Sequence, residues 1–198
     1  MSQQRSGDEE FSRLRSLIWP IHRHEMKKFL PMSLILFFVL LMYTVGRNLK
    51  DALVVTAPCS GSEVLNFLKA WIVFPCSLLF VVGYSKMSNM LSAQRLYYAT
   101  LMPFVVFFAL FGLFIYPYRD LLHPSLETIQ TLQASYPYFR WFFPIYGVWT
   151  FSLFYTVVEL WGNVGVSLLF WQFANQITKN SEAKRFYGLF GAVGNFAL

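Results

Sequence analysis

One long apolar segment with a charged cluster inside it limits what this chain can fold into. Residues 31–46 carry no charge, residues 47–51 read Arg-Asn-Leu-Lys-Asp, and the sequence is then apolar again up to Pro58. A helix over residues 30–57 would be about 42 Å long, whereas the hydrocarbon core of a bilayer is ~30 Å thick. We therefore predict a membrane-spanning helix whose charges lie just inside or at the far boundary of the membrane.

Arg47 and Lys50, in this cluster, are the first candidate functional residues. Ionisable side chains at membrane depth cost ~2.5–3.5 kcal/mol each on insertion scales, so they usually face a cavity or a partner. The alternative interpretation ends the span at Gly46 and places both side chains at the interface, where Lys and Arg extend toward the headgroups. The helix by itself leaves both interpretations open.

The composition is that of a membrane protein. Hydrophobic residues make up 56% of the chain and charged residues 13%, whereas soluble domains carry about 25% charged residues. We predict an all-α, polytopic helical membrane protein with a transporter-like bundle. The net charge of +6 does not indicate nucleic-acid binding, because the basic residues follow the expected topology. The two cysteines have no disulfide or metal-site spacing, and we expect no metal and no cofactor.

Polar segments divide the chain into a basic N-terminal segment, residues 1–28, and a transmembrane region, residues 29–198. The predicted spans lie at about residues 30–57, 67–85, 96–116, 142–174 and 186–198. The last stretch is shorter than the ~20 residues that a span needs. The chain is therefore expected to stop within its fifth helix.

The positions of Lys and Arg predict the orientation. Six of them lie in the N-terminal segment, two in the loop after the second span and three in the loop after the fourth, against three on the opposite side. Cytoplasmic loops carry an excess of Lys and Arg. The N-terminus and the loops after the second and fourth spans are therefore expected in the cytoplasm, with the spans surrounded by membrane lipids.

Glu159 is a second charge at membrane depth. No interface position is available for it, because residues 141–158 and 160–178 are uncharged. On a helix, four polar residues would share one face, expected toward the bundle interior: Ser152, Tyr155, Glu159 and Asn163. Gly162 and Gly165 would let another helix or a ligand approach closely. The alternative to a functional role is a protonated Glu159 that is hydrogen-bonded to a neighbouring helix.

The two charged helices together indicate a transport pathway. Asp51 lies four residues after Arg47 and can pair with it, which leaves Lys50 and Glu159 without local partners. Such charges on different spans predict either a buried ion pair or a site that a charged solute balances. Arg and Lys both suit phosphate groups. We therefore expect an anionic or zwitterionic solute, with Arg47, Lys50, Asp51, Glu159 and Asn163 as candidate substrate-binding residues.

Several strings, spread over almost the whole chain, carry a family resemblance. They include Trp-Pro-Ile-His at 19–22, the segment 47–58, Tyr-Pro-Tyr-Arg-Asp at 116–120, Glu-Leu-Trp-Gly at 159–162 and Ser-Glu-Ala-Lys-Arg-Phe-Tyr at 181–187. In these strings the chain resembles the non-mitochondrial ATP/ADP translocases, which are nucleotide transporters of intracellular bacteria and plastids.

This resemblance implies about twelve spans, of which the chain would supply the N-terminal part, with the remaining C-terminal half as its partner. It also implies ATP import in exchange for ADP across the bacterial inner membrane, and it implicates Lys50 and Glu159 in substrate handling. The chain departs from the family motif at Asn48 and Leu49, beside the basic pair, and at Asn163. The lost negative charge at residue 48 can change which nucleotide is preferred.

Three alternatives remain beside the antiporter. The first is a proton-coupled importer of several nucleotides with Glu159 as the proton carrier, and the second is a fragment that does not transport. The third is a membrane enzyme, which the sequence disfavours because it contains neither a Walker loop nor a zincin motif. We therefore predict that the chain is not an enzyme.

Overall fold

The computed structural model describes residues 21–22 and 25–197, which fold into helices joined by short connections, with no strand among them. The all-α prediction is thereby confirmed. Most of the basic N-terminal segment predicted over residues 1–28 lies outside the described residues. Wherever the chain is apolar for long enough, a helix satisfies its backbone hydrogen bonds internally, as a bilayer requires.

Four long helices are long and apolar enough to cross a membrane, which confirms the polytopic prediction. They are α2 (Met26–Val55); α3 (Ser62–Leu68) continued by η1 (Lys69–Val73) and α4 (Phe74–Met90); α5 (Ala93–Leu110) continued by η2 (Phe111–Ile115); and α9 (Trp149–Asn163) continued by η4 (Val164–Phe170) and α10 (Trp171–Ile177). Each of the last three contains one π-helical segment, η1, η2 or η4.

The fourth long helix begins later than the predicted span 142–174. Phe143–Gly147 forms a separate short helix, α8. Val148, with φ −120° and ψ 46°, separates α8 from α9. The Ser152 hydroxyl donates to the carbonyl of Ile145 at 3.0 Å, which satisfies a backbone group left open by the break. Hydropathy does not reveal the break, because the residues on both sides of it are apolar.

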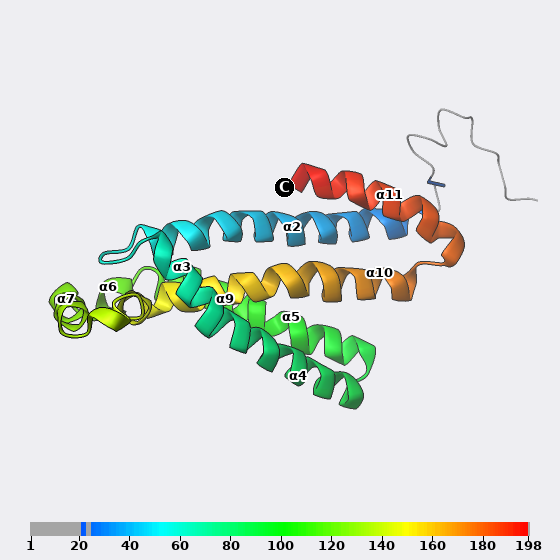
Figure 1. The fold of residues 1–198 in the computed structure, drawn as a ribbon. Coiled ribbons are helices and arrows are strands. Elements are labelled where there is room, and N and C mark those ends of the chain that lie inside the picture. Colours follow the sequence, from blue (N-terminus) through cyan, green and yellow to red (C-terminus); the bar gives the residue numbers. More distant parts are fainter. Residues whose placement is uncertain (1–20, 23–24, 198) are drawn as a thin grey trace, which may run out of the picture.

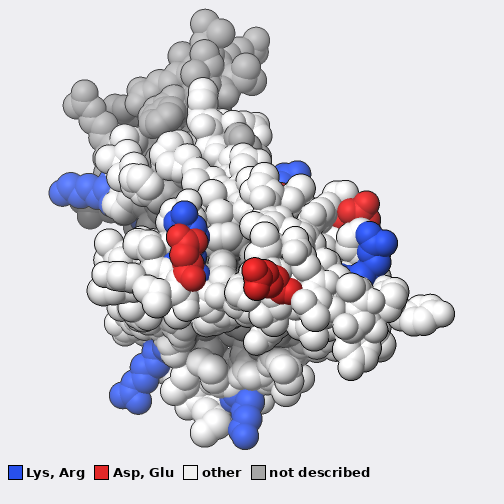
Figure 2. Space-filling model, turned by 90° about the vertical axis from the view of Figure 1, so that its left-hand side faces the viewer, with Lys and Arg blue, Asp and Glu red and all other residues white. Residues whose placement is uncertain are grey.

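Short helices gather at one end of the bundle: α6 (Arg119–Leu122), α7 (Leu126–Ser135), η3 (Pro137–Phe139) and α8 (Figure 1). Ser125 caps α7 by accepting a hydrogen bond from the backbone N–H of Thr128 at 3.3 Å. Seen from this end, scattered charged side chains, some of them adjacent to an opposite charge, lie on a mostly uncharged surface (Figure 2).

The centre of the bundle is the contact between α2 and α9–η4–α10, which run side by side in opposite directions (Figure 1). The helix α11 (Asn180–Ala197) lies along the other side of α2, whereas α4 and α5 lie against the fourth helix. Residues 186–197 of the predicted stretch 186–198 fall within α11, and residue 198 lies outside the described residues. This helix is not among the four candidate spans found in the described residues.

Glycines set the distance between α2 and α9. A Cβ atom on Gly162 would lie 2.3 Å from a ring carbon of Tyr43, and one on Gly46 would lie 3.0 Å from the side chain of Val158. A Cβ atom on Gly165 would lie 3.2 Å from Val39. The prediction that Gly162 and Gly165 allow close approach is confirmed, and the approaching helix is α2.

Two ion pairs fasten the start of α11 to the start of α2. Arg185 pairs with Glu25, which is 4% exposed, and the Lys28 ammonium lies 2.7 Å from the Glu182 carboxylate. Beside them, Phe29 packs against aromatic rings of α11. The hydrogen bond from Lys28 lowers the pKa of Glu182, which lies outside the four spans, below its ordinary value of 4.5.

We expect Gly162→Val to destabilise the protein by about 1–3 kcal/mol, because the added side chain overlaps the Tyr43 ring in a packed contact. Gly83→Val is the matched control, since nothing lies within 4 Å of its added Cβ. Thermal unfolding in detergent, followed by circular dichroism, measures both. Equal unfolding midpoints for the two variants would contradict the close packing.

The pair between Lys28 and Glu182 makes stability depend on pH. Because the folded pKa of Glu182 lies below 4.5, the pair stabilises the fold fully above that pH and is lost as the pH falls through the lowered pKa. We expect the free energy of unfolding to fall in that range by no more than the ~1 kcal/mol of a partly exposed pair, and the unfolding midpoint to fall with it. Glu182→Gln should flatten this part of the profile, whereas Glu127→Gln, on exposed α7, should not.

Candidate substrate site

The Lys50 ammonium is the centre of the candidate site. Its side chain is 4% exposed, near the end of α2, and its Nζ lies 2.7 Å from Asp51 Oδ1 and 3.0 Å from Glu159 Oε1. A charge removed from water needs partners, and charge-assisted hydrogen bonds are the strong ones. The pairing expected between Lys50 and Glu159, from two different helices, is therefore present.

The expected pairing of Asp51 with Arg47 is wrong. Asp51 pairs with Lys50 instead, and Arg47 is exposed and forms no ion pair within residues 25–197. The physical reason is burial: α2 continues past Gly46 to Val55, which places Lys50 against α9, away from water. Its flexible stem then turns the ammonium to both carboxylates within reach, whereas the exposed Arg47 is not held against α9.

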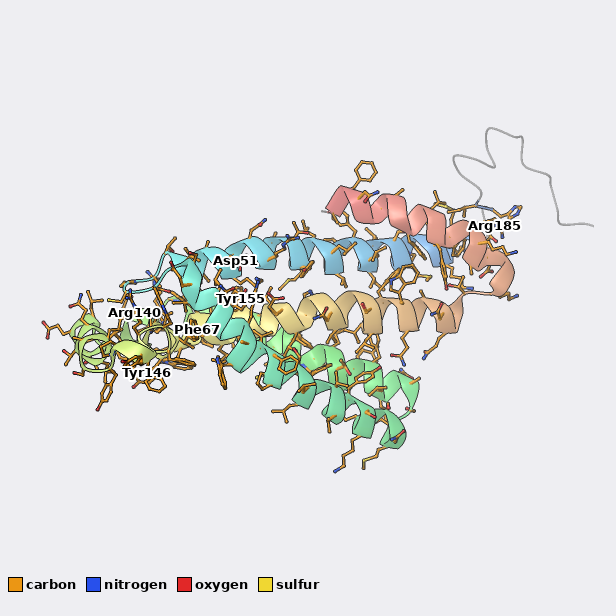
Figure 3. All side chains as sticks on the ribbon, in the orientation of Figure 1. Asp51, Phe67, Arg140, Tyr146, Tyr155 and Arg185 are labelled. Carbon is orange, nitrogen blue, oxygen red and sulfur yellow. The ribbon has the colours of Figure 1, made fainter. Side chains whose placement is uncertain are left out.

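Tyr155 lies against the ammonium from the side of α9. The Nζ of Lys50 is 4.0 Å from the centre of the Tyr155 ring, within the range of a cation–π interaction. Figure 3 shows Asp51 and Tyr155 close to each other between α2 and α9. Tyr155 is fully buried and belongs to the apolar core cluster that also contains Val54 and Val158. The ammonium therefore sits where the polar stripe meets the core.

The polar stripe on α9 changes from buried to exposed along the helix. Ser152 and Tyr155 face the interior, as predicted. The Glu159 side chain is 25% exposed, and Asn163 is exposed and donates to the backbone carbonyl of Glu159 at 3.4 Å. The structure thus brings Lys50, Asp51 and Glu159 together, with Asn163 one turn further toward the surface and Arg47 exposed on α2.

The charges of this cluster do not balance. One ammonium faces two carboxylates, which are partly exposed while the ammonium is not. An anion that reaches the ammonium therefore competes with carboxylates that are free to turn back toward water. In this arrangement an anionic oxygen of a solute can replace a carboxylate oxygen as the hydrogen-bond acceptor of the ammonium. No group of three or more potential metal ligands occurs in the described part of the chain.

Comparison with known proteins gives a consistent result. The family model described as TLC ATP/ADP transporter matches residues 4–198. ADP,ATP carrier protein 1 of Chlamydia muridarum is 54% identical over 194 residues, which are 98% of this chain and 36% of that protein. The chain belongs to the TLC ATP/ADP transporter family. Because this is a family of transporters, the alternative of a membrane enzyme is set aside.

Other relatives in this transporter family show the same coverage. ADP,ATP carrier protein 1 of Rickettsia typhi is 48% identical over 192 residues, 97% of this chain and 38% of that protein. ADP,ATP carrier protein 3 of Rickettsia conorii is 44% identical over 188 residues, 95% of this chain and 37% of that protein. The chain thus spans less than two-fifths of the length of these relatives. No solved structure matches it.

Two features of the structure were missed from the sequence. Tyr155 was placed on the polar stripe but not in the site, although its position four residues before Glu159 puts it beside that carboxylate. The ion pairs between α2 and α11 were also missed. Their sequence signal is a pair of opposite charges three residues apart at each helix start, Glu25 with Lys28 and Glu182 with Arg185.

Lys50 and Glu159 should be energetically coupled. We expect Lys50→Met to destabilise the protein by about 2 kcal/mol, less than the 3–5 kcal/mol of a fully buried pair, because Glu159 is partly exposed. The double variant Lys50→Met/Glu159→Gln should lose less than the sum of the two single variants. Thermal unfolding in detergent measures the cycle, with exposed Lys86→Met as the control. Strictly additive losses would contradict the pairing.

Proposed function

We propose that this chain is part of a nucleotide antiporter that imports ATP in exchange for ADP, with Arg47, Lys50, Asp51, Glu159 and Asn163 handling the nucleotide. The observation that carries the proposal is the buried ammonium of Lys50 between carboxylates, at the contact of two apolar helices. Intramembrane ionisable groups that face one another are typical of solute pathways. The relatives' names, ADP,ATP carrier protein, supply the solute class.

The geometry supports a simple binding sequence. In the empty site the ammonium of Lys50 is held by Glu159 and Asp51. An arriving phosphate supplies charged oxygens that replace a carboxylate, and Lys binds it as a point charge. Arg47, which is exposed and unpaired with any carboxylate of the described residues, adds a bidentate donor. When the nucleotide leaves, the carboxylates return to the ammonium and restore the empty state.

The orientation that we propose places the N-terminus in the cytoplasm and the protein in the bacterial inner membrane. Figure 1 shows the start of α2, the turn between α4 and α5, and the turn between α10 and α11 at the same end of the bundle. The described basic residues at these three places, which the positive-inside rule assigns to the cytoplasm, therefore lie at one end of the bundle. The exposed apolar residues of the spans would contact lipid or the remaining part of the carrier.

The proposed partner is the rest of a full-length carrier. The relatives are more than twice as long as this chain. In transporters built from repeats, the solute site lies between the repeats, near the middle of the membrane. The cluster around Lys50 would then form one side of the site, and the remaining part of the protein would form the other.

The test is uptake of radiolabelled ATP by bacterial cells that express the full-length protein, with and without preloaded ADP. We expect internal ADP to stimulate uptake, and Lys50→Gln and Glu159→Gln each to reduce it at least ~10-fold, the effect of losing one charged hydrogen bond. Lys86→Gln, an exposed lysine, is the control.

Wild-type uptake by both site variants would overturn the proposed roles. Uptake that internal ADP does not stimulate, that other nucleotides compete for and that an uncoupler abolishes would instead identify the proton-coupled importer. No uptake of any nucleotide by the unmodified protein would overturn the transport function itself.

A further inference from the structure

The hydroxyl group of Tyr155 is a buried polar group without a close hydrogen bond. The side chain is 0% exposed, and its oxygen makes no close hydrogen bond among the described residues, with the Lys50 ammonium as the group that it meets at longer range. A buried hydroxyl without a partner costs free energy, because it has given up its bonds to water. Phenylalanine would fill the same volume without that cost. The hydroxyl is therefore better explained by a second state of the site.

The position of the hydroxyl relates it to Lys50. An ammonium has three N–H donors. That of Lys50 donates to Asp51, and Glu159 Oε1 lies 3.0 Å from its nitrogen. Its remaining side faces the Tyr155 ring at 4.0 Å. The hydroxyl belongs to that same ring and already lies within the long end of hydrogen-bond reach of the ammonium. A short shift of the ammonium along the ring therefore brings it to the hydroxyl oxygen.

The partners of Lys50 differ in how easily they leave. Asp51 is its neighbour in sequence, whereas Glu159 comes from another helix and has a side chain that is 25% exposed. Tyr155 cannot turn away, because its ring is enclosed by the apolar core. When an anion displaces Glu159, Tyr155 is thus the fixed group on the α9 side of the ammonium.

We infer that Tyr155 is the positioning residue for Lys50: its ring holds the ammonium in the empty site, and its hydroxyl accepts a hydrogen bond from the ammonium when substrate phosphate displaces Glu159. This inference rests on the proposed nucleotide transport. The hydroxyl then keeps Lys50 at the depth of the site, so that the ammonium meets the phosphate instead of following Glu159 toward the surface. While Glu159 holds the ammonium, the Tyr155 hydroxyl lacks a close hydrogen bond.

The test compares Tyr155→Phe with Tyr155→Leu in the full-length protein, by thermal unfolding and by the kinetics of ATP uptake. Tyr155→Phe keeps the ring and removes the unpaired hydroxyl, so its unfolding midpoint should equal or exceed that of the unmodified protein. Its KM for ATP should nevertheless rise about tenfold, the order expected for one hydrogen bond to a charged group. Tyr155→Leu also loses the ring, and should lower the midpoint and raise KM further.

The control is Phe154→Leu, on the same helix. Phe154 is 5% exposed and stacks on Phe111 with ring centres 4.2 Å apart, so its loss should lower the unfolding midpoint and leave KM unchanged. An unchanged KM in Tyr155→Phe would overturn the role of Tyr155 and leave the transport function intact. Failure of the unmodified protein to take up nucleotide would overturn the transport function, and this inference with it.

Discussion

A buried ammonium between two apolar helices is the interaction on which the rest of this structure depends. Lys50 is 4% exposed, so its charge must be matched by groups that reach it inside the bundle. Glu159 supplies one of them only because α9 lies close to α2, and α9 lies close only because glycines occupy the contact. The ion pair of Lys50 with Glu159 thus depends on the distance between α2 and α9, and that distance depends on the small side-chain volume of the glycines.

The helical character and the long spans follow from sequence alone, since a bilayer leaves an apolar chain few other structures. The meeting of Lys50 with Glu159 was also foreseeable, because each was a charge in an apolar helix with no adequate partner nearby. The pairing of Asp51 with Lys50 could not be foreseen from the sequence. Helical spacing favours Arg47, but burial decides the outcome, and burial depends on where α9 lies. The break at Val148 could not be predicted either, because hydropathy reports apolar content and not backbone angles.

The two ends of α2 are held by ionic contacts of different character. At its start, Glu25 and Lys28 each meet one opposite charge on α11, so these contacts are balanced. Near its end, Lys50 meets two carboxylates, and the contact carries an excess of negative charge. Each charge at the start of α2 has a single ionic partner, whereas Lys50 has two, so an arriving anion can replace one carboxylate while the ammonium keeps the other. This difference is consistent with a structural contact at one end and a responsive one at the other.

The contact between Gly162 and Tyr43 also limits which substitutions this protein can accept during evolution. The space that a side chain at residue 162 would need is already filled by the ring of Tyr43, so the two positions share one volume. Bulk can be exchanged between them, but bulk added at Gly162 alone must displace the Tyr43 ring or separate α2 from α9. A separation there would move Glu159 away from Lys50. Selection that preserves the pair of Lys50 with Glu159 therefore also acts on Tyr43 and Gly162, although neither is charged.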